Sequence, residues 1–136
     1  MAKFEGGCAC GAVRYSTDAE PIMAGHCQCR HCQRLSGAGH LTFAAFPEPA
    51  VKVKGTVNYW DYKADSGNTA SRGHCPTCGS MLLGKTSGMP GMIAFNLTSL
   101  DDPSKITPQM VFFSAMGQIW DQIDPALPKF PGMPPM

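Results

Sequence analysis

The chain has 136 residues, of which 43% are hydrophobic and 15% are charged, and its formal net charge is +1. This length fits one domain, and a charged fraction below the typical ~25% indicates a compact globule rather than a disordered chain. A near-neutral charge without a basic run argues against a nucleic-acid partner. No apolar stretch approaches the ~20 residues of a membrane helix, and the first residues hold no apolar signal region. We therefore expect a cytoplasmic protein with no membrane partner.

Glycine and proline, with 15 and 12 residues, divide the sequence into short β-rich runs. Several runs alternate with the period of two that is typical of half-buried strands. In chain order, strands are expected over residues 13–15, 41–46, 51–53, 57–62, 81–83, 92–97 and 110–114. One short helix is expected over residues 29–35, and Ser36 and Gly37 would end it. The sequence thus predicts a mainly β, single-domain fold with one short helix.

We expect the folded domain to cover residues 1–124 and a proline-rich tail to cover residues 125–136. The tail contains five prolines, which lack the N–H that a sheet or helix requires. The tail is therefore expected not to continue a sheet or a helix. It would lie extended on the surface or free in solvent.

Seven cysteines form three closely spaced groups, namely Cys8 with Cys10, Cys27 with Cys29 and Cys32, and Cys75 with Cys78. An odd number without a secretion signal fits a disulfide framework poorly, whereas reduced thiols at short spacing are typical of metal ligands. Gly11 and Gly79 each follow one group, and such glycines let a tight loop direct backbone N–H groups at the sulfurs. The sequence therefore predicts metal binding by these thiols.

Seven thiolates divide naturally into a site of four and a site of three. Four thiolates close a tetrahedral zinc site, whereas three leave one position for water or a substrate atom. Sequential use would combine Cys8, Cys10, Cys27 and Cys29, and separately Cys32, Cys75 and Cys78. The alternative combines Cys8, Cys10, Cys75 and Cys78, and keeps Cys27, Cys29 and Cys32 together. We favour the second, because three sulfurs within six residues can face one ion from a single loop and helix start.

Other interpretations of these spacings stay open. Both sites could be structural, with His26, His31 or a carboxylate completing the second one. Cys-Pro-x-Cys-Gly turns also hold iron, and the sequence does not separate the two metals. A disulfide-only arrangement is the least favoured interpretation.

Candidate proton carriers are the four histidines, His26, His31, His40 and His74. Arg30 and Arg34 flank the middle cysteines and could attract a carboxylate. For each of these side chains we favour a hydrogen-bonded loop or solvated helix position without a catalytic role. No catalytic residue is therefore assigned beyond the metal ligands.

Three motifs cover most of the chain in a fixed order. The first is FEGGCACGAVRY at residues 4–15, the second is CQCRHCQRLSGA at 27–38, and the third is RGHCPTCGS at 72–80. They are followed by SLDDP at residues 99–103, by Trp120 and by LPKF at residues 127–130. This ordered set resembles the glutathione-dependent formaldehyde-activating enzyme family, whose domain is shared with centromere protein V.

The resemblance implies a zinc-binding fold called a β-tent, with two zinc ions as cofactors. By motif, a structural zinc would be held by Cys8, Cys10, Cys75 and Cys78, and a catalytic zinc with an open position by Cys27, Cys29 and Cys32. The implied activity is that of a zinc-dependent carbon–sulfur lyase acting on a thiol adduct, such as S-hydroxymethylglutathione formed from glutathione and formaldehyde. The implied partner is a small-molecule thiol or aldehyde. The alternative is a non-catalytic zinc module for protein interaction, as relatives of the fold suggest.

Overall fold

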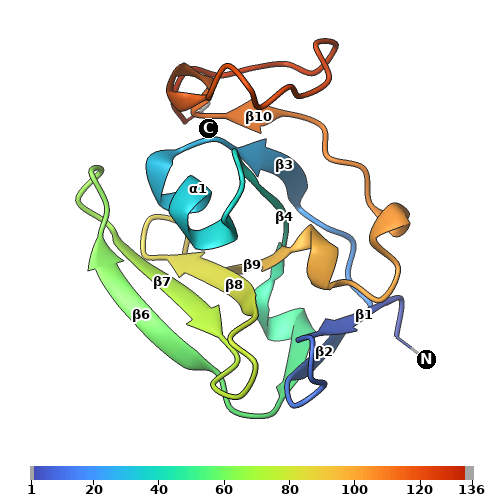
Figure 1. Cartoon of the computed structure of the whole chain (residues 1–136). Coiled ribbons are helices and arrows are strands. Elements are labelled where there is room, and N and C mark those ends of the chain that lie inside the picture. Colours follow the sequence, from blue (N-terminus) through green and yellow to red (C-terminus); the bar gives the residue numbers. More distant parts are fainter. Residues whose placement is uncertain (1, 134–136) are drawn as a thin grey trace.

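Ten strands and one α-helix form the described part of the chain, residues 2–133 of a computed structural model (Figure 1). The strands are β1 (Phe4–Gly7), β2 (Arg14–Thr17), β3 (Met23–Cys27), β4 (Leu41–Pro47), β5 (Val51–Lys54), β6 (Asn58–Lys63), β7 (Thr69–His74), β8 (Met81–Thr86), β9 (Met92–Asn96) and β10 (Val111–Phe112). The helix is α1 (Arg30–Ser36), and four 3₁₀ turns are η1 (Glu48–Ala50), η2 (Leu97–Ser99), η3 (Pro103–Lys105) and η4 (Ser114–Met116). The prediction of a mainly β fold with one short helix is confirmed.

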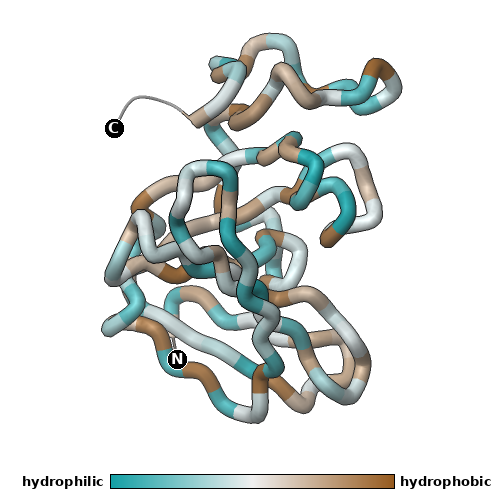
Figure 2. Tube along the Cα trace, turned by 90° about the vertical axis from the view of Figure 1, so that its left-hand side faces the viewer, coloured by the Kyte–Doolittle hydropathy of each residue, from teal (hydrophilic) through white to brown (hydrophobic). Residues whose placement is uncertain are grey.

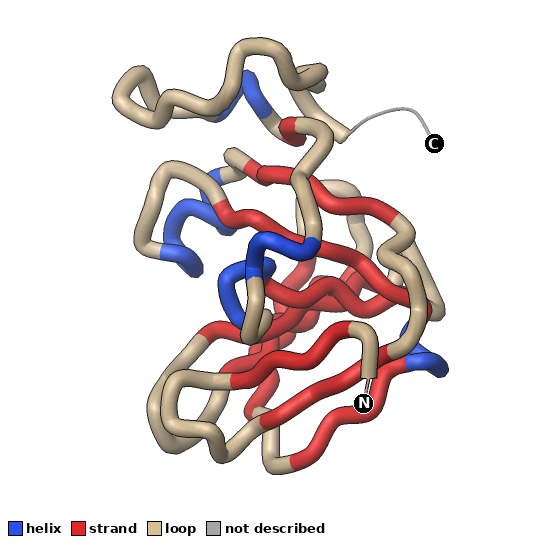
Figure 3. Tube along the Cα trace, turned by 90° about the vertical axis from the view of Figure 1, so that its right-hand side faces the viewer, coloured by secondary structure: helices blue, strands red, loops and turns tan. Residues whose placement is uncertain are grey.

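The strands form two sheets. The smaller sheet has the order β1-β2-β5, and the larger has the order β10-β3-β4-β9-β8-β7-β6. Neighbours pair antiparallel, apart from β10, which runs parallel to β3. Figure 3 shows the strands crossing the body of the molecule, with loops gathered at its ends.

The main core lies between the two sheets. Phe4 and Tyr15 of the smaller sheet meet Phe46 and Phe95 of the larger one, and all four side chains are buried. Tyr15 stacks on Phe95, and Phe4 lies 5.7 Å from Phe46 between ring centroids. Gly6 completes this contact, since a Cβ there would lie 2.4 Å from the carbonyl oxygen of Ser99. Burial of these aromatic side chains removes large apolar surfaces from water and holds the sheets together.

Each of the seven expected strands overlaps a strand of the structure, but β1, β3 and β7 were not predicted. Their sequences are FEGG, MAGHC and TASRGH, which are rich in glycine and polar residues. Such segments have weak strand propensity by themselves. They become strands because neighbours on one or both sides satisfy their backbone hydrogen bonds.

Helix α1 begins and ends one residue later than the predicted range of 29–35, and Gly37 ends it as expected. The sulfur of Cys29 at the N-cap accepts a hydrogen bond from the backbone N–H of Cys32, at 3.3 Å. Gly37 ends the helix with φ of 72°, a left-handed conformation that glycine adopts without strain. The helix therefore places Cys29 and Cys32 one turn apart on the same side.

Part of the proline-rich tail pairs with β10, which the sequence did not predict. Val111 donates its N–H to the carbonyl of Pro128 and accepts from the N–H of Phe130, both at 2.9 Å. The expectation that this segment cannot continue a sheet is therefore wrong. Proline lacks an N–H, but its carbonyl still accepts hydrogen bonds, and the residues between the prolines donate them.

In Figure 2 the segment that leads to the C-terminus carries both hydrophobic and hydrophilic residues. Residues 134–136 of the tail lie outside the described part.

No helix within the described residues is long and apolar enough to cross a membrane.

Candidate metal centres and substrate site

The first thiol cluster joins the two sheets. Cys8 and Cys10 lie in the loop between β1 and β2, and Cys75 and Cys78 lie in the turn between β7 and β8. The four sulfur atoms lie within 4.8 Å of one another. Cys10 is 3.6 Å from Cys8 and 3.8 Å from Cys75, sulfur to sulfur. A tetrahedral zinc with 2.3 Å bonds needs sulfurs about 3.8 Å apart, so this donor set fits such an ion.

Backbone N–H groups point at the sulfurs of this cluster. Val13 donates to the sulfur of Cys8 at 3.2 Å, and Thr77 donates to the sulfur of Cys75 at 3.3 Å. Gly11 and Gly79 have φ of 83° and 78°, which lets both loops turn tightly enough for these contacts. Such hydrogen bonds stabilise thiolates, as the glycine positions in the sequence indicated.

The second thiol cluster lies where β3 meets α1. Cys27 is the last residue of β3, Cys29 caps α1 and Cys32 lies in its first turn. Their sulfurs also lie within 4.8 Å of one another, and Cys27 and Cys32 are buried. The alternative in which Cys8, Cys10, Cys27 and Cys29 share one site is not found among residues 2–133.

The second cluster favours a bound cation. Hydrogen bonds from the thiols of Cys27 and Cys32 lower the pKa of Cys29 to about 2. The pKa of Cys27 is raised far above its usual value, because it donates to Cys29 and Cys32 and is buried. Three close sulfurs cannot all ionise without a positive charge among them. A divalent cation would provide that charge, and three thiol donors would leave one position of a tetrahedral ion free.

The buried side chain of Gln33 fixes the loop that carries the second cluster. Gln33 donates to the carbonyl of Gln28 at 2.7 Å and to that of Met116 at 3.0 Å. The side-chain oxygen of Gln33 accepts hydrogen bonds from the side chains of Arg30 and Gln118. Helix α1 is thereby tied both to the cysteine loop and to the segment after β10.

Arg72 of β7 is a residue of this site that sequence reasoning did not identify. Its Nη2 lies 3.8 Å from the sulfur of Cys32 and 3.2 Å from the hydroxyl of Tyr62. Burial lowers the pKa of Arg72, but attraction to Cys32 and the hydrogen bond with Tyr62 outweigh it and raise the pKa overall. The sequence held no local signal of this contact, because Arg72 lies in an unpredicted strand 40 residues from Cys32.

The histidines lie in different environments. Nδ1 of His26 is 2.7 Å from Oγ1 of Thr42, and the ring of His26 meets His40 edge to face at 4.8 Å. Desolvation and the neighbouring His40 lower the pKa of His26. His31, on the exposed side of α1, stacks on Tyr62 at 4.6 Å. These contacts explain the positions of His26 and His31 without assigning either a catalytic role.

A groove of about 630 Å³ lies beside the first thiol cluster. Cys8 and Ser80 line it on the side of the first cluster, and His40 lines it on the side of β4. Leu41 and Met81 line the groove and also pack against the second cluster. Its volume falls within the range of small-molecule sites.

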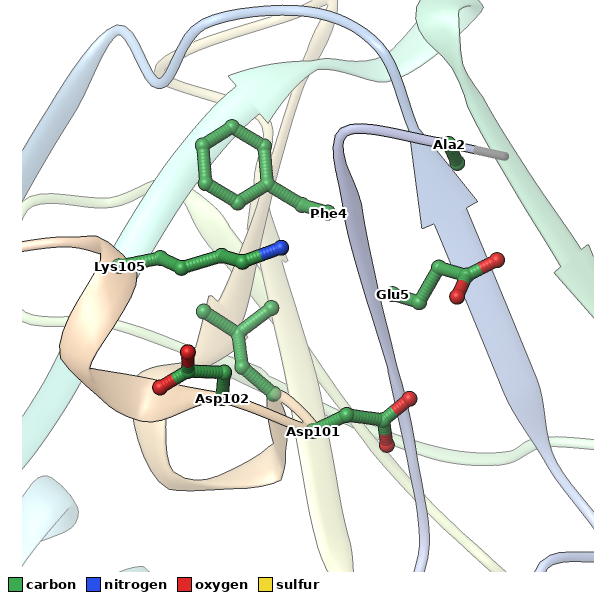
Figure 4. A pocket seen from close by; sticks show the side chains of 7 residues that line it. Ala2, Phe4, Glu5, Asp101, Asp102 and Lys105 are labelled. Atoms are coloured by element: carbon green, nitrogen blue, oxygen red, sulfur yellow. The ribbon is translucent and has the colours of Figure 1, made fainter.

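A second, smaller cavity of about 60 Å³ lies between β1 and η3 and contains no cysteine (Figure 4). Glu5, Asp101 and Asp102 line it, and Figure 4 shows the Asp102 carboxylate pointing to the opposite side from that of Glu5. Lys105 faces the same space. The Glu5 and Asp102 carboxylates therefore do not converge on one point of this cavity.

The family comparison agrees with this geometry. The family described as glutathione-dependent formaldehyde-activating enzyme (GFA) matches residues 3–116, which include both thiol clusters. The chain belongs to the GFA family. GFA membership indicates an activity related to glutathione and formaldehyde, and the mainly β single domain with two thiol clusters is consistent with the GFA fold.

A crystal structure of a Rhodobacter sphaeroides protein is similar to this GFA protein in fold, with a TM-score of 0.59 and 22% sequence identity. The similarity covers 76% of this chain and 91% of the other. Among curated proteins, no sequence matches the chain.

Proposed function

We propose that this GFA protein is a zinc-dependent carbon–sulfur lyase-type enzyme that acts on the adduct of a thiol and formaldehyde. The observation that carries the proposal is the second thiol cluster, in which Cys27, Cys29 and Cys32 offer three donors to an ion that prefers four. A structural site has no need of a free position, whereas a catalytic one does. Family membership supplies the substrate pair, glutathione and formaldehyde.

The proposed reaction balances as a reversible addition. The thiol sulfur forms a bond to the formaldehyde carbon, the carbonyl π bond breaks, and the thiol proton ends on the new hydroxyl oxygen. Zinc held by the second cluster would act as a Lewis acid that binds the substrate sulfur as a thiolate at neutral pH. Because three cysteine thiolates already surround the site, a soft sulfur ligand suits it better than water activation.

The two clusters take different roles in this proposal. Cys8, Cys10, Cys75 and Cys78 hold a structural zinc that fixes the two sheets relative to each other. Cys27, Cys29 and Cys32 hold the catalytic zinc, and Gln33 orients their loop through its hydrogen bonds to Gln28 and Met116. The domain of residues 1–124 carries both sites, and we propose that the protein works in the cytoplasm, where thiols stay reduced.

The test combines metal content with turnover. Elemental analysis of the purified protein is expected to give two zinc ions per chain. In ¹³C NMR exchange spectra, the protein is expected to speed the interconversion of formaldehyde and S-hydroxymethylglutathione above the uncatalysed rate. Two zinc ions without any acceleration would overturn the enzymatic proposal and favour a zinc module for protein interaction.

A further inference from the structure

Arg72 lies on β7, the strand next to the edge strand β6 of the larger sheet, and its side chain extends toward the second thiol cluster. In the sheet it pairs with Trp60 of β6 and Gly84 of β8. Helix α1 lies against β6 and β7, because His31 stacks on Tyr62 and Cys32 contacts Arg72 (Figure 1). The guanidinium therefore lies at the boundary between the sheet and the helix that carries the thiols.

The positive charge of Arg72 has no carboxylate partner among the described residues. The salt bridges of residues 2–133 do not include it. Its Nε and Nη2 donate to the hydroxyl of Tyr62 at 3.3 and 3.2 Å, and Nη2 also faces the sulfur of Cys32 at 3.8 Å. A partly buried guanidinium held only by a hydroxyl and a sulfur can still bind an anion strongly.

One nitrogen of the guanidinium keeps unused hydrogen-bond donors. Among the described residues, Nη1 of Arg72 has no hydrogen-bond partner. Residue 84 beside it is glycine, and a Cβ there would lie 2.9 Å from Nη1. The missing side chain lets the guanidinium pack directly against the backbone of β8, which holds Nη1 in place.

The surrounding side chains favour an anion. Strand residues on the face of Arg72 alternate with those on the other face, so this face carries Trp60, Tyr62 and Ala70 but not Asp61. The rings of His31, Tyr62 and Trp60 stack in a row at 4.6 and 4.5 Å, and Trp60 is 51% exposed. The row leads from the cysteine helix to solvent, and the face of β6 and β7 that carries it holds no carboxylate to repel an incoming anion.

We propose that Arg72 forms a carboxylate-binding site beside the second thiol cluster and selects thiol substrates that carry a negative charge close to the sulfur. The substrate sulfur would bind at the second cluster while its carboxylate pairs with Nη1 of Arg72. This inference rests on the proposed function, in which that cluster binds the substrate thiol. It adds the substrate class and the residue that recognises it.

The test compares two three-carbon thiols, 3-mercaptopropionate and 3-mercapto-1-propanol, which end in a carboxylate and in a hydroxyl. Their dissociation constants are measured on the zinc-loaded protein by isothermal titration calorimetry. A charge-assisted hydrogen bond predicts that the carboxylate thiol binds about 10- to 100-fold more tightly. Arg72→Gln is expected to abolish this preference, and Arg72→Lys to keep part of it, because lysine keeps the charge but loses the planar fork.

Arg34→Gln is the matched control. Arg34 is exposed on the same helix as Cys32, so its removal changes the net charge equally without touching the proposed site. The preference is expected to survive in Arg34→Gln. Equal affinity of both thiols for the wild type, or an unchanged preference in Arg72→Gln, would overturn the inference.

Gly84→Ala keeps the inference testable if Arg72→Gln fails to fold, which circular dichroism and zinc content would reveal. The added Cβ would lie 2.9 Å from Nη1, so it displaces the guanidinium from its position while it leaves the charge in place. It is expected to weaken 3-mercaptopropionate binding at least fivefold and to leave 3-mercapto-1-propanol binding unchanged. Equal effects on both thiols would contradict the inference.

Failure of the inference and failure of the proposed function are distinguishable. A charge preference that depends on Arg72, without acceleration of formaldehyde exchange, would retain the carboxylate site and reject the reaction. Accelerated exchange with no charge preference would retain the reaction and reject the carboxylate site.

Discussion

Nδ1 of His40 lies 2.9 Å from both carboxylate oxygens of Asp121, although the two residues are 81 positions apart. Asp121 also accepts a hydrogen bond from Nε2 of Gln28 at 3.0 Å, and its side chain is only 11% exposed. Gln28 lies between Cys27 and Cys29 in the chain. Asp121 therefore ties the segment after η4 to the loop of the second thiol cluster.

Asp121→Ala is expected to lower the free energy of unfolding by about 1–3 kcal/mol, because it leaves the polar groups of Gln28 and His40 without their charged partner. Urea denaturation followed by circular dichroism measures this loss. Asp65→Asn, an exposed aspartate in the β6–β7 turn, is the control and is expected to change stability little. Equal stability of Asp121→Ala and the wild type would show that the segment is held by other contacts.

The two thiol clusters are expected to respond differently to loss of a ligand. Cys29→Ser and Cys32→Ser should leave a folded protein that contains about one zinc less and has no activity with formaldehyde and glutathione. Cys75→Ser and Cys78→Ser should instead impair folding, because their cluster joins the two sheets. Zinc analysis and thermal unfolding measure both effects. If both pairs of variants unfold to the same extent, the division into a catalytic and a structural site is wrong.

The tail is expected to contribute to stability through Phe130. Its ring packs with Phe112 at 6.4 Å and is partly buried. Phe130→Ala should lower the free energy of unfolding by about 1–2 kcal/mol, less than a fully buried phenylalanine would. Ile119→Ala is the matched control, since Ile119 is 91% exposed. A tail that does not stay on β10 in solution would give the same denaturation midpoint for both variants.

The ion pair of Arg14 and Asp101 predicts a defined pH dependence. Arg14 donates from Nη1 to Asp101 at 2.9 Å, and this hydrogen bond lowers the pKa of Asp101 below its usual value. The pair therefore stabilises the fold above pH ~3.9, where aspartate in the unfolded chain is ionised, and this contribution falls as the pH drops toward the native pKa.

Urea denaturation of the wild type and Asp101→Asn over a range of pH values checks this dependence. At neutral pH the wild type should be more stable by at most about 1 kcal/mol, because the Asp101 side chain is 52% exposed. The difference should shrink below pH ~3.9 and vanish once Asp101 is protonated. A difference that grows on acidification would contradict the assignment.

Local patterns in the sequence determined the strands with alternating residues, the helix that ends at Gly37 and the set of thiols near one another in the chain. Alternation, capping and short cysteine spacing depend on neighbours within a few residues, so a single sequence carries them. The cysteine spacing favoured the pairing of the first and third cysteine groups, and the family resemblance implied the same pairing.

Only the tertiary structure decided which distant residues complete the site. Arg72 meets Cys32, Asp121 meets His40, and Phe130 pairs with Val111 through contacts between segments far apart in the chain. These contacts depend on sheet order and on strands such as β3 and β7, whose own residues have weak strand propensity. A local sequence pattern cannot indicate these contacts, because the groups that hydrogen-bond to the backbone or pair with the charge come from distant parts of the chain.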